Sequence, residues 1–243
     1  FVDHDAELLA RAAGAVSLTN AAAGTVAGSA GGNFGVASPA ASMTVGTVAG
    51  VSGISTPGGT VQLSAGTGLT ISQEISAGAT GRVDLVTGTA GGLLTIDAPV
   101  TAARVTATTD RITVNAAFGV GASEVDLATT DPTRGILIGT GTGGSQLANP
   151  GSDTTALALN QAEFDRLGSA TAAVRLSTGT GTIAIQGAPP ASSVGLDLGS
   201  RRLFLATGNS TGSAISQTHR IVGASGSALA ATAASGSVIL TNT

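Results

Sequence analysis

Two aspartates occupy the same place in two similar short segments of the chain. Asp84 lies between apolar residues in VDLV, and Asp126 does so in VDLA. Paired carboxylates serve in acid–base catalysis and in calcium sites, but both roles need the acids close together. These two lie two sequence repeats apart, no third acid follows in register, and the calcium-binding pattern GGxGxD is absent. We therefore expect both side chains to face solvent and to form no site.

The chain holds two histidines, His4 and His219, near opposite ends of the sequence, and no cysteine. A catalytic triad or a zinc site needs several such groups at one place. Two remote imidazoles supply neither, and the lack of cysteine excludes thiolate catalysis, disulfides and cysteine-based metal sites. The sequence thus predicts no catalytic residue, no metal site and no cofactor, and we expect a protein that is not an enzyme.

Glycine-rich strings such as GTGTGG from Gly139 are weak candidates for phosphate loops. A phosphate loop carries GK[ST] between a strand and a helix, whereas all ten basic residues of this chain are Arg. Scattered arginines within a net charge of −4 also form no basic stripe for nucleic acid. We expect these glycines at corners of the fold, and no nucleic-acid partner.

Threonines at alternating positions are a further candidate, because hydroxyls and methyls repeated on one flat face order water in ice-binding solenoids. The preference of threonine for strands is the simpler explanation. The threonines concerned are Thr87 and Thr89, Thr106 and Thr108, Thr140 and Thr142, and Thr178, Thr180 and Thr182. A specialised face, either ice-binding or carbohydrate-active with Asp and Arg or Lys clustered together, is therefore the alternative to a purely structural role.

The elements that would position these residues follow a degenerate repeat. Leu63, Leu85, Val105 and Leu127 are spaced by about 20 to 22 residues. Segments of the form apolar–x–apolar, closed by small residues and glycine, begin at Val61, Val83, Arg104, Glu124, Val174, Leu203 and Val238. Such a repeat indicates a solenoid, in which each short strand pairs with its equivalent one coil away.

The composition suits a thin aliphatic column. Hydrophobic residues make up 42% of the chain but aromatic residues only 2%, and 37 residues are Gly. Inward Val, Ile, Leu and Ala side chains would stack at about 4.8 Å per coil, with Gly at the corners. At about 20 residues per coil, the chain would make roughly twelve coils and rise by about 55 Å. We expect Leu85 to point into this column and Asp84 to point out of it.

One segment departs from the strand pattern, near residues 160–167. Asn160 and Glu163 have the spacing of a capping box, Phe164 and Leu167 share a helical face, and Gly168 stands where a helix C-cap belongs. We expect one or two helical turns there. The N-terminal HDAELLARAAG also has helical propensity, but it matches the strand-forming repeat as well.

The two ends of the sequence resemble each other. AVSLTN, from Ala15 to Asn20, matches SVILTN, from Ser237 to Asn242, with Leu18 and Leu240 offset by 222 residues. This echo suggests about one super-repeat of a longer array. Because the chain begins at Phe1 and not at Met, we expect residues 1–243 to form a single solenoid segment of a longer protein.

Three long stretches carry a resemblance to a known family. They are MTVGTVAGVSGISTPGGTVQLSAGTGLTISQEISAG from Met43, LALNQAEFDRLGSATAAVRLSTGTGTIAIQG from Leu157, and the stretch from Leu203 to Asn242. They look like the repeats of filamentous-haemagglutinin-like exoproteins of two-partner secretion systems, with AEFDRL before VRLSTGTG as the most distinctive element. The resemblance implies a right-handed parallel β-helix, exported through an outer-membrane β-barrel of a Gram-negative bacterium, with roles in adhesion, biofilms or contact-dependent processes.

We therefore expect an all-β protein, a right-handed parallel β-helix of about 20 residues per coil with one helical insertion near residues 160–167. The expected function is that of a structural or adhesive extracellular fibre or stalk segment of a secreted bacterial surface protein. Its expected partners are copies of itself or adjacent repeats joined head to tail, an outer-membrane transporter, and a host or neighbouring cell surface. No apolar run is long enough to span a bilayer, so we expect no membrane insertion.

Overall fold

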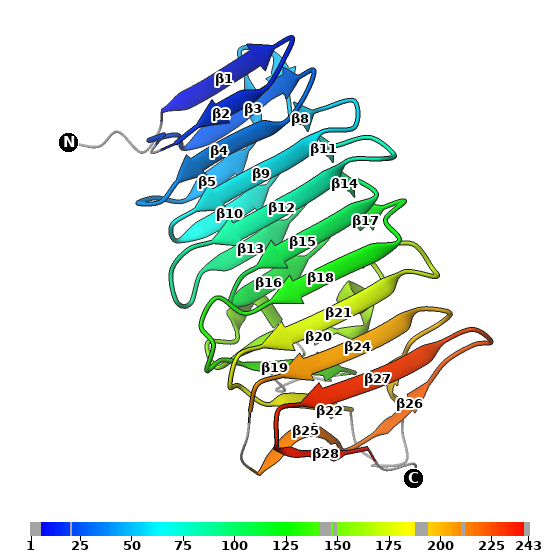
Figure 1. Ribbon diagram of the computed structural model, residues 1–243. Coiled ribbons are helices and arrows are strands. Elements are labelled where there is room, and N and C mark those ends of the chain that lie inside the picture. The colour runs from blue at the N-terminus through cyan, green and yellow to red at the C-terminus, as the bar shows by residue number, and fades with distance from the viewer. Residues whose placement is uncertain are drawn as a thin grey trace.

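The chain winds into a stack of parallel coils with three faces, as the computed structural model shows (Figure 1). The structure describes residues 6–19, 21–140, 147, 150–187, 194–209 and 212–240. Every pairing between strands is parallel except one short hairpin in this described part. The fold is the parallel β-helix expected from the repeat.

Face 1 is a nine-stranded sheet that runs the length of the described solenoid. Its strands in spatial order are β2 (Val16–Leu18), β4 (Phe34–Ser38), β9 (Thr60–Ala65), β12 (Arg82–Thr87), β15 (Arg104–Thr108), β18 (Glu124–Ala128), β21 (Ala173–Thr178), β24 (Arg202–Thr207) and β27 (Ala228–Ala233). Spatial order follows chain order throughout, so each coil lays one strand beside the last.

Face 2 extends along the solenoid in the same way as face 1, but its sheet is divided into two parts. The first part holds β5 (Met43–Val45), β10 (Gly68–Ile71), β13 (Leu93–Ile96) and β16 (Arg111–Val114). The second is a five-stranded sheet in the order β20 (Ala156–Asn160), β19 (Gly135–Gly139), β22 (Ile183–Gln186), β25 (Ser213–Gln217) and β28 (Ser237–Ile239). No backbone ladder joins β16 to β20. In this second part, β19 and β20 stand in reverse chain order.

Face 3 is built from shorter strands. It holds β8 (Ile54–Ser55), β11 (Ile75–Ser76), β14 (Val100–Thr101) and β17 (Phe118–Val120), and β23 (Val194–Asp197) pairs with β26 (Arg220–Val222) in the last coils. At the N-terminal end, β3 (Thr25–Ala30) pairs with both β5 and β8, and β1 (Glu7–Ala12) lies beside β3. Residues 7–12 thus form a strand, and the competing helical propensity of this segment does not prevail.

The interior is a column of in-register apolar rows from face 1, aliphatic except for Phe34. One row is Val16, Phe34, Val61, Val83, Val105, Val125, Val174, Leu203 and Leu229. The next is Leu18, Val36, Leu63, Leu85, Ala107, Leu127, Leu176, Leu205 and Ala231. Leu85 points inward and is 1% exposed, as expected. Val105 belongs to the first row, so its alignment with Leu85 and Leu127 in the sequence repeat was wrong by two residues.

Coil length varies more than the repeat suggested. The step is 22 residues from Val61 to Val83 and again to Val105, and 20 from there to Val125. It is 27 from Phe34 to Val61, where β6 (Thr47–Val48) and β7 (Val51–Ser52) add an antiparallel hairpin, and 49 from Val125 to Val174. The prediction of twelve coils was therefore wrong, because face 1 has nine strands over the residues that the structure places and rises by only about 40 Å.

The long coil contains the expected helical insertion. A 3-10 turn, η2 (Pro150–Ser152), precedes β20, and α1 (Gln161–Phe164) follows it. Asn160 is the N-cap, and its side chain and that of Glu163 form the predicted capping box. Phe164 and Leu167 are both fully buried, and Gly168 has a φ of +65°, which suits the end of a helical turn. The segment then forms a parallel bridge from Leu167 to Phe118 on face 3.

Candidate functional surfaces

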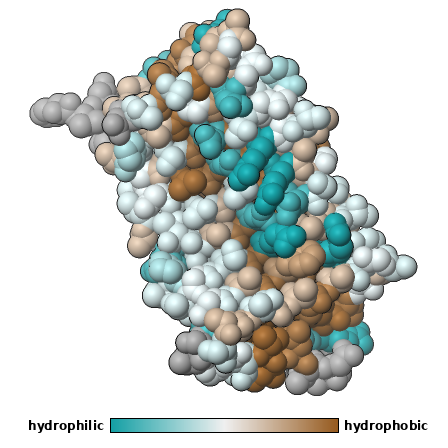
Figure 2. Space-filling view, viewed as in Figure 1, coloured by the Kyte–Doolittle hydropathy of each residue, from teal (hydrophilic) through white to brown (hydrophobic). Residues whose placement is uncertain are grey.

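A cluster of paired charges lies on the outer side of face 1. Asp84, Thr106 and Asp126 are neighbours in one outward row, so the two aspartates lie two coils apart, as expected. Figure 2 shows hydrophilic side chains gathered in a band across the middle of this face. The aspartates are not simply solvated, however, because their side chains are only 16% and 18% exposed.

Each carboxylate of this cluster contacts an arginine. Arg82 Nε lies 2.5 Å from Asp84 Oδ1, and Arg104 donates to Asp126. Glu124 is a third acid, which the search for aspartates in register missed, and its two oxygens lie 3.3 Å from Arg104 and 2.5 Å from Arg175. Such exposed networks contribute modestly to stability and leave no free carboxylate pair for catalysis or calcium.

An aromatic ring extends the cluster by one strand. Arg175 lies over the ring of Phe204 on β24, with 4.5 Å between the guanidinium carbon and the ring centroid. Cation–π contacts of this kind hold a planar guanidinium in place and shield its apolar neighbours. The outer side of face 1 is therefore a surface of mutually paired groups between β12 and β24.

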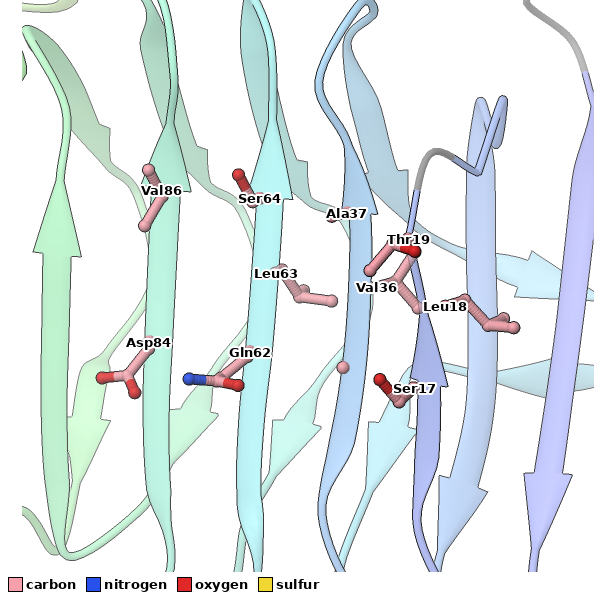
Figure 3. Close-up of a pocket in the computed structure, with 11 residues that line it drawn as sticks. Ser17, Leu18, Thr19, Val36, Ala37, Gln62, Leu63, Ser64, Asp84 and Val86 are labelled. Carbon is pink, nitrogen blue, oxygen red and sulfur yellow. The ribbon is translucent and has the colours of Figure 1, made fainter.

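A shallow groove of about 260 Å³ adjoins this cluster at the N-terminal end of face 1. Ala37 and Val86 are its outward apolar residues, and Gln62 and Asp84 lie side by side on neighbouring strands at its edge (Figure 3). The groove exists because the outward residues here are small, as at Gly35. Asp84 is the one member of the charged cluster that lines it, so the groove does not gather the charged groups into a site.

The threonine pairs singled out in the sequence do not share a face. Thr87 and Thr178 are buried at a corner, where Thr87 Oγ1 donates to Thr109 Oγ1 at 2.9 Å and Thr178 Oγ1 donates to the Arg134 carbonyl at 2.6 Å. Thr106 and Thr108 point outward from β15. Thr142 lies outside the described residues. These buried threonines bond to a neighbouring hydroxyl and to a backbone carbonyl at the corner, which is a structural role.

A different set of threonines does stack. The register of face 2 places in one outward row Thr25, Thr44, Thr70, Thr95 and Thr113. The signal in the sequence is a threonine between two apolar residues, as in MTV, LTI and ITV, which the search for Thr-x-Thr pairs overlooked. The row is one residue wide, because the outward neighbours along the strands are residues such as Gly68, Leu93 and Arg111.

His219 has a local structural role. Its Nδ1 accepts a hydrogen bond from the Gly187 N–H at 2.9 Å. The ring lies against Gly187 and the His219 Cβ against Gly195, so closely that neither glycine has room for a Cβ. His4 lies outside the described residues, as does most of the glycine string that follows Gly139. Among the residues that the structure places, no three acidic or histidine side chains are arranged to hold a metal ion.

The strands at the two ends of the described solenoid have a neighbour on one side only. These are β1 and β2 at one end and β26, β27 and β28 at the other. The C-terminal end presents apolar surface, visible at the bottom of Figure 2, where Val238, Ile239 and Leu240 are 41%, 43% and 39% exposed. A groove of about 380 Å³ beside them is lined by Leu198, Leu229 and other residues of the last coil.

The two similar segments at the ends of the sequence form strands on different faces. Val16 belongs to β2 on face 1, whereas Val238 belongs to β28 on face 2. Two segments one whole number of coils apart would lie on the same face. The echo therefore does not mark equivalent positions of two coils, and continuation of the array beyond residues 1–243 stays a prediction.

Comparison of the chain with protein-family models, with curated proteins and with solved structures finds no match. No helix in the described ranges is long and apolar enough to cross a membrane.

Proposed function

We propose that this chain is a shaft segment of an extracellular fibre or stalk, belonging to a secreted bacterial surface protein of the filamentous-haemagglutinin-like kind. The observation that carries the proposal is the uninterrupted interior. Inward rows continue in register through all nine strands of face 1, from Val16 to Leu229. A structure in which each coil contacts only its neighbours extends by repetition of the same unit.

The proposal includes continuation at both ends. A strand edge with free N–H and C=O groups pairs readily with another strand, and the exposed apolar residues of the last coil would be covered by the next one. That coil is either the following part of a longer chain or a second copy joined head to tail. A head-to-tail contact of this type is heterologous and builds an open filament. Export through an outer-membrane transporter and attachment to a host or neighbouring cell belong to the same proposal.

Electron microscopy of the full-length native protein tests this proposal. We expect thin rods whose length grows with the number of repeats. The matched variants Leu229→Asp, on the inward row, and Ala230→Asp, on the outward row of the same strand, separate the interior from the surface. Leu229→Asp should shorten or break the rods, whereas Ala230→Asp should leave them unchanged. Compact particles for the full-length protein would overturn the proposal.

A carbohydrate-active surface is the second candidate, because one specific observation favours it. Face 1 does gather acidic residues and arginines, namely Asp84, Glu124, Asp126, Arg82, Arg104 and Arg175. Their mutual pairing opposes it, since a glycan-binding carboxylate or guanidinium has to be free to meet its ligand. Release of reducing ends from polyuronates or neutral glycans, abolished by Arg104→Met and kept by Arg220→Met, would establish this candidate in place of the fibre.

A further inference from the structure

Face 2 holds two strands at the height where face 1 holds one. Between β15 and β21, face 1 has β18 alone. Over the same rise, between β16 and β22, face 2 has β20 and then β19. After β18 the chain first forms β19, beside β22. It then turns back toward the N-terminal end of the solenoid and forms β20 between β16 and β19. This reversal needs a physical cause, because neighbouring elements in a chain usually lie in sequential order.

The inward residues do not supply that cause. In β19 the buried inward side chains are Ile136 and Ile138, and in β20 they are Leu157 and Leu159. Both strands show the same apolar–x–apolar pattern with similar volumes, and such swaps in a core are well tolerated. The sequential order, with β19 beside β16 and β20 beside β22, would bury an equivalent inward set, although the outward Leu137 and Ala158, which are also buried, differ in size. Packing of the column alone therefore leaves the two orders close in free energy.

The helical insertion distinguishes the two orders. The Val114 N–H donates to Glu163 Oε1 at 3.0 Å, and Arg166 Nη1 donates to the Val114 carbonyl at 2.9 Å. These are backbone groups of β16 that would otherwise bond to the next strand of face 2. Glu163 Oε2 also accepts the N–H of Asn160, the last residue of β20, at 3.1 Å. We call Glu163 and Arg166 with their contacts to Val114 the α1 clip.

The α1 clip ties the end of β20 to the edge of β16. Since α1 follows β20 directly, these contacts require β20 to occupy the position next to β16. Glu163 is only 5% exposed, and a buried carboxylate costs free energy unless it is fully bonded. Buried polar groups of this kind have a documented use in selecting one register among alternatives of similar stability.

We propose that the α1 clip is a conformational device that selects the reversed order of β19 and β20 over the sequential order. With the clip intact, only the reversed order is populated. Loss of the clip frees the edge of β16 for pairing with β19, and β20 then takes the position beside β22. The sequence from β19 to α1 is thus a two-state element within an otherwise repetitive column.

Engineered disulfides report which order is present, since the chain has no native cysteine. In the observed order Leu137 lies opposite Ala184, so Leu137→Cys with Ala184→Cys forms a disulfide on oxidation. Ala158 is one strand further from Ala184, with β19 between them. Two strand spacings of about 4.8 Å exceed the Cα separation that a disulfide spans. Ala158→Cys with Ala184→Cys therefore cross-links only in the sequential order.

The experiment combines each cysteine pair with Glu163→Met/Arg166→Met, which removes both side-chain contacts to Val114, and measures intramolecular cross-linking by mass spectrometry of digested protein. We expect the yield of the 158–184 disulfide to rise at least tenfold over the clip-intact protein. The matched control is Glu124→Met/Arg175→Met, which removes a Glu–Arg pair on face 1 without touching Val114. The control should leave both yields unchanged.

A clip variant that unfolds cooperatively and still forms only the 137–184 disulfide overturns the proposal. Where the double variant fails to fold, Glu163→Met alone carries the same comparison, because it removes the acceptor of both the Val114 and the Asn160 N–H groups. A rise of the 158–184 disulfide in the face-1 control as well would also overturn it, since the selection would then not belong to the clip.

Discussion

At the residue scale, Ala49 adopts a backbone conformation that alanine disfavours. Ala49 has a φ of +48° and Gly50 a φ of +78° in the turn between β6 and β7. Two positive φ angles define a type I′ hairpin turn, which prefers Asn-Gly and disfavours alanine. We expect Ala49→Asn to raise the free energy of unfolding by about 0.5 to 1 kcal/mol. Denaturant titration measures this change, with Ala40→Asn, an exposed turn alanine without a positive φ, as the neutral control.

Substitutions at two neighbouring residues of one strand should cost very different amounts of stability. Leu85 is 1% exposed and stacks between Leu63 and Ala107, so Leu85→Asp places an uncompensated carboxylate in the column. We expect a loss of roughly 3 to 5 kcal/mol. Asp84→Ala removes only its partly exposed ion pair with Arg82 and should cost less than about 1 kcal/mol. Equal melting temperatures for the two variants would contradict the inward assignment.

Glu163 makes stability depend on pH. Burial raises the pKa of its carboxyl above the ordinary value of 4.5, against the hydrogen bonds from Val114 and Asn160 and the charge of Arg166. Because the folded state holds this proton more tightly, the stabilisation from protonation is complete below about pH 4.5 and is lost as pH rises through the folded pKa. The free energy of unfolding of the wild type minus that of Glu163→Gln should therefore decrease as pH rises above 4.5. A pH-independent difference would contradict this.

At the scale of elements, an arginine fastens the helical insertion to the coil below. Arg201 is 9% exposed, donates from Nε to the Leu167 carbonyl at 3.0 Å, and donates from Nη2 to the Asp165 carbonyl at 2.5 Å. Arg201→Met leaves both carbonyls without this donor, so we expect a loss of about 2 kcal/mol and faster amide exchange around Leu167. Arg202→Met, an exposed neighbour on face 1, should change neither quantity.

Local patterns predicted the elements well, and long-range pairing was harder to infer. The capping box at Asn160 and Glu163 was found because both partners lie within four residues of each other. The placement of Val105 was wrong because the apolar–x–apolar pattern repeats every second residue and allows a shift by two. The reversed order of β19 and β20 had no sequence signal, because it depends on side chains that meet the backbone of a distant strand at Val114.

At the scale of the whole molecule, stability should be graded along the solenoid. Each coil contacts only the coils beside it, so the outermost strands lack a partner on one side. We expect hydrogen exchange to be slowest in β9, β12 and β15 and fastest in β1, β27 and β28. Mass spectrometry of exchanged peptides measures this gradient. Uniform protection along the chain would mean that the column unfolds as one cooperative unit.

The unequal coil lengths have an evolutionary consequence. The 49-residue step from Val125 to Val174 leaves the register of face 1 unchanged on either side. Doubling a connection costs only about 0.6 kcal/mol in closure entropy, so whole peptides are tolerated as inserts at such a corner. A single residue added inside a face-1 strand would instead turn every later side chain of that strand inside out. Variation among related chains, and any grafted epitope, should therefore accumulate at the corners and spare the strands.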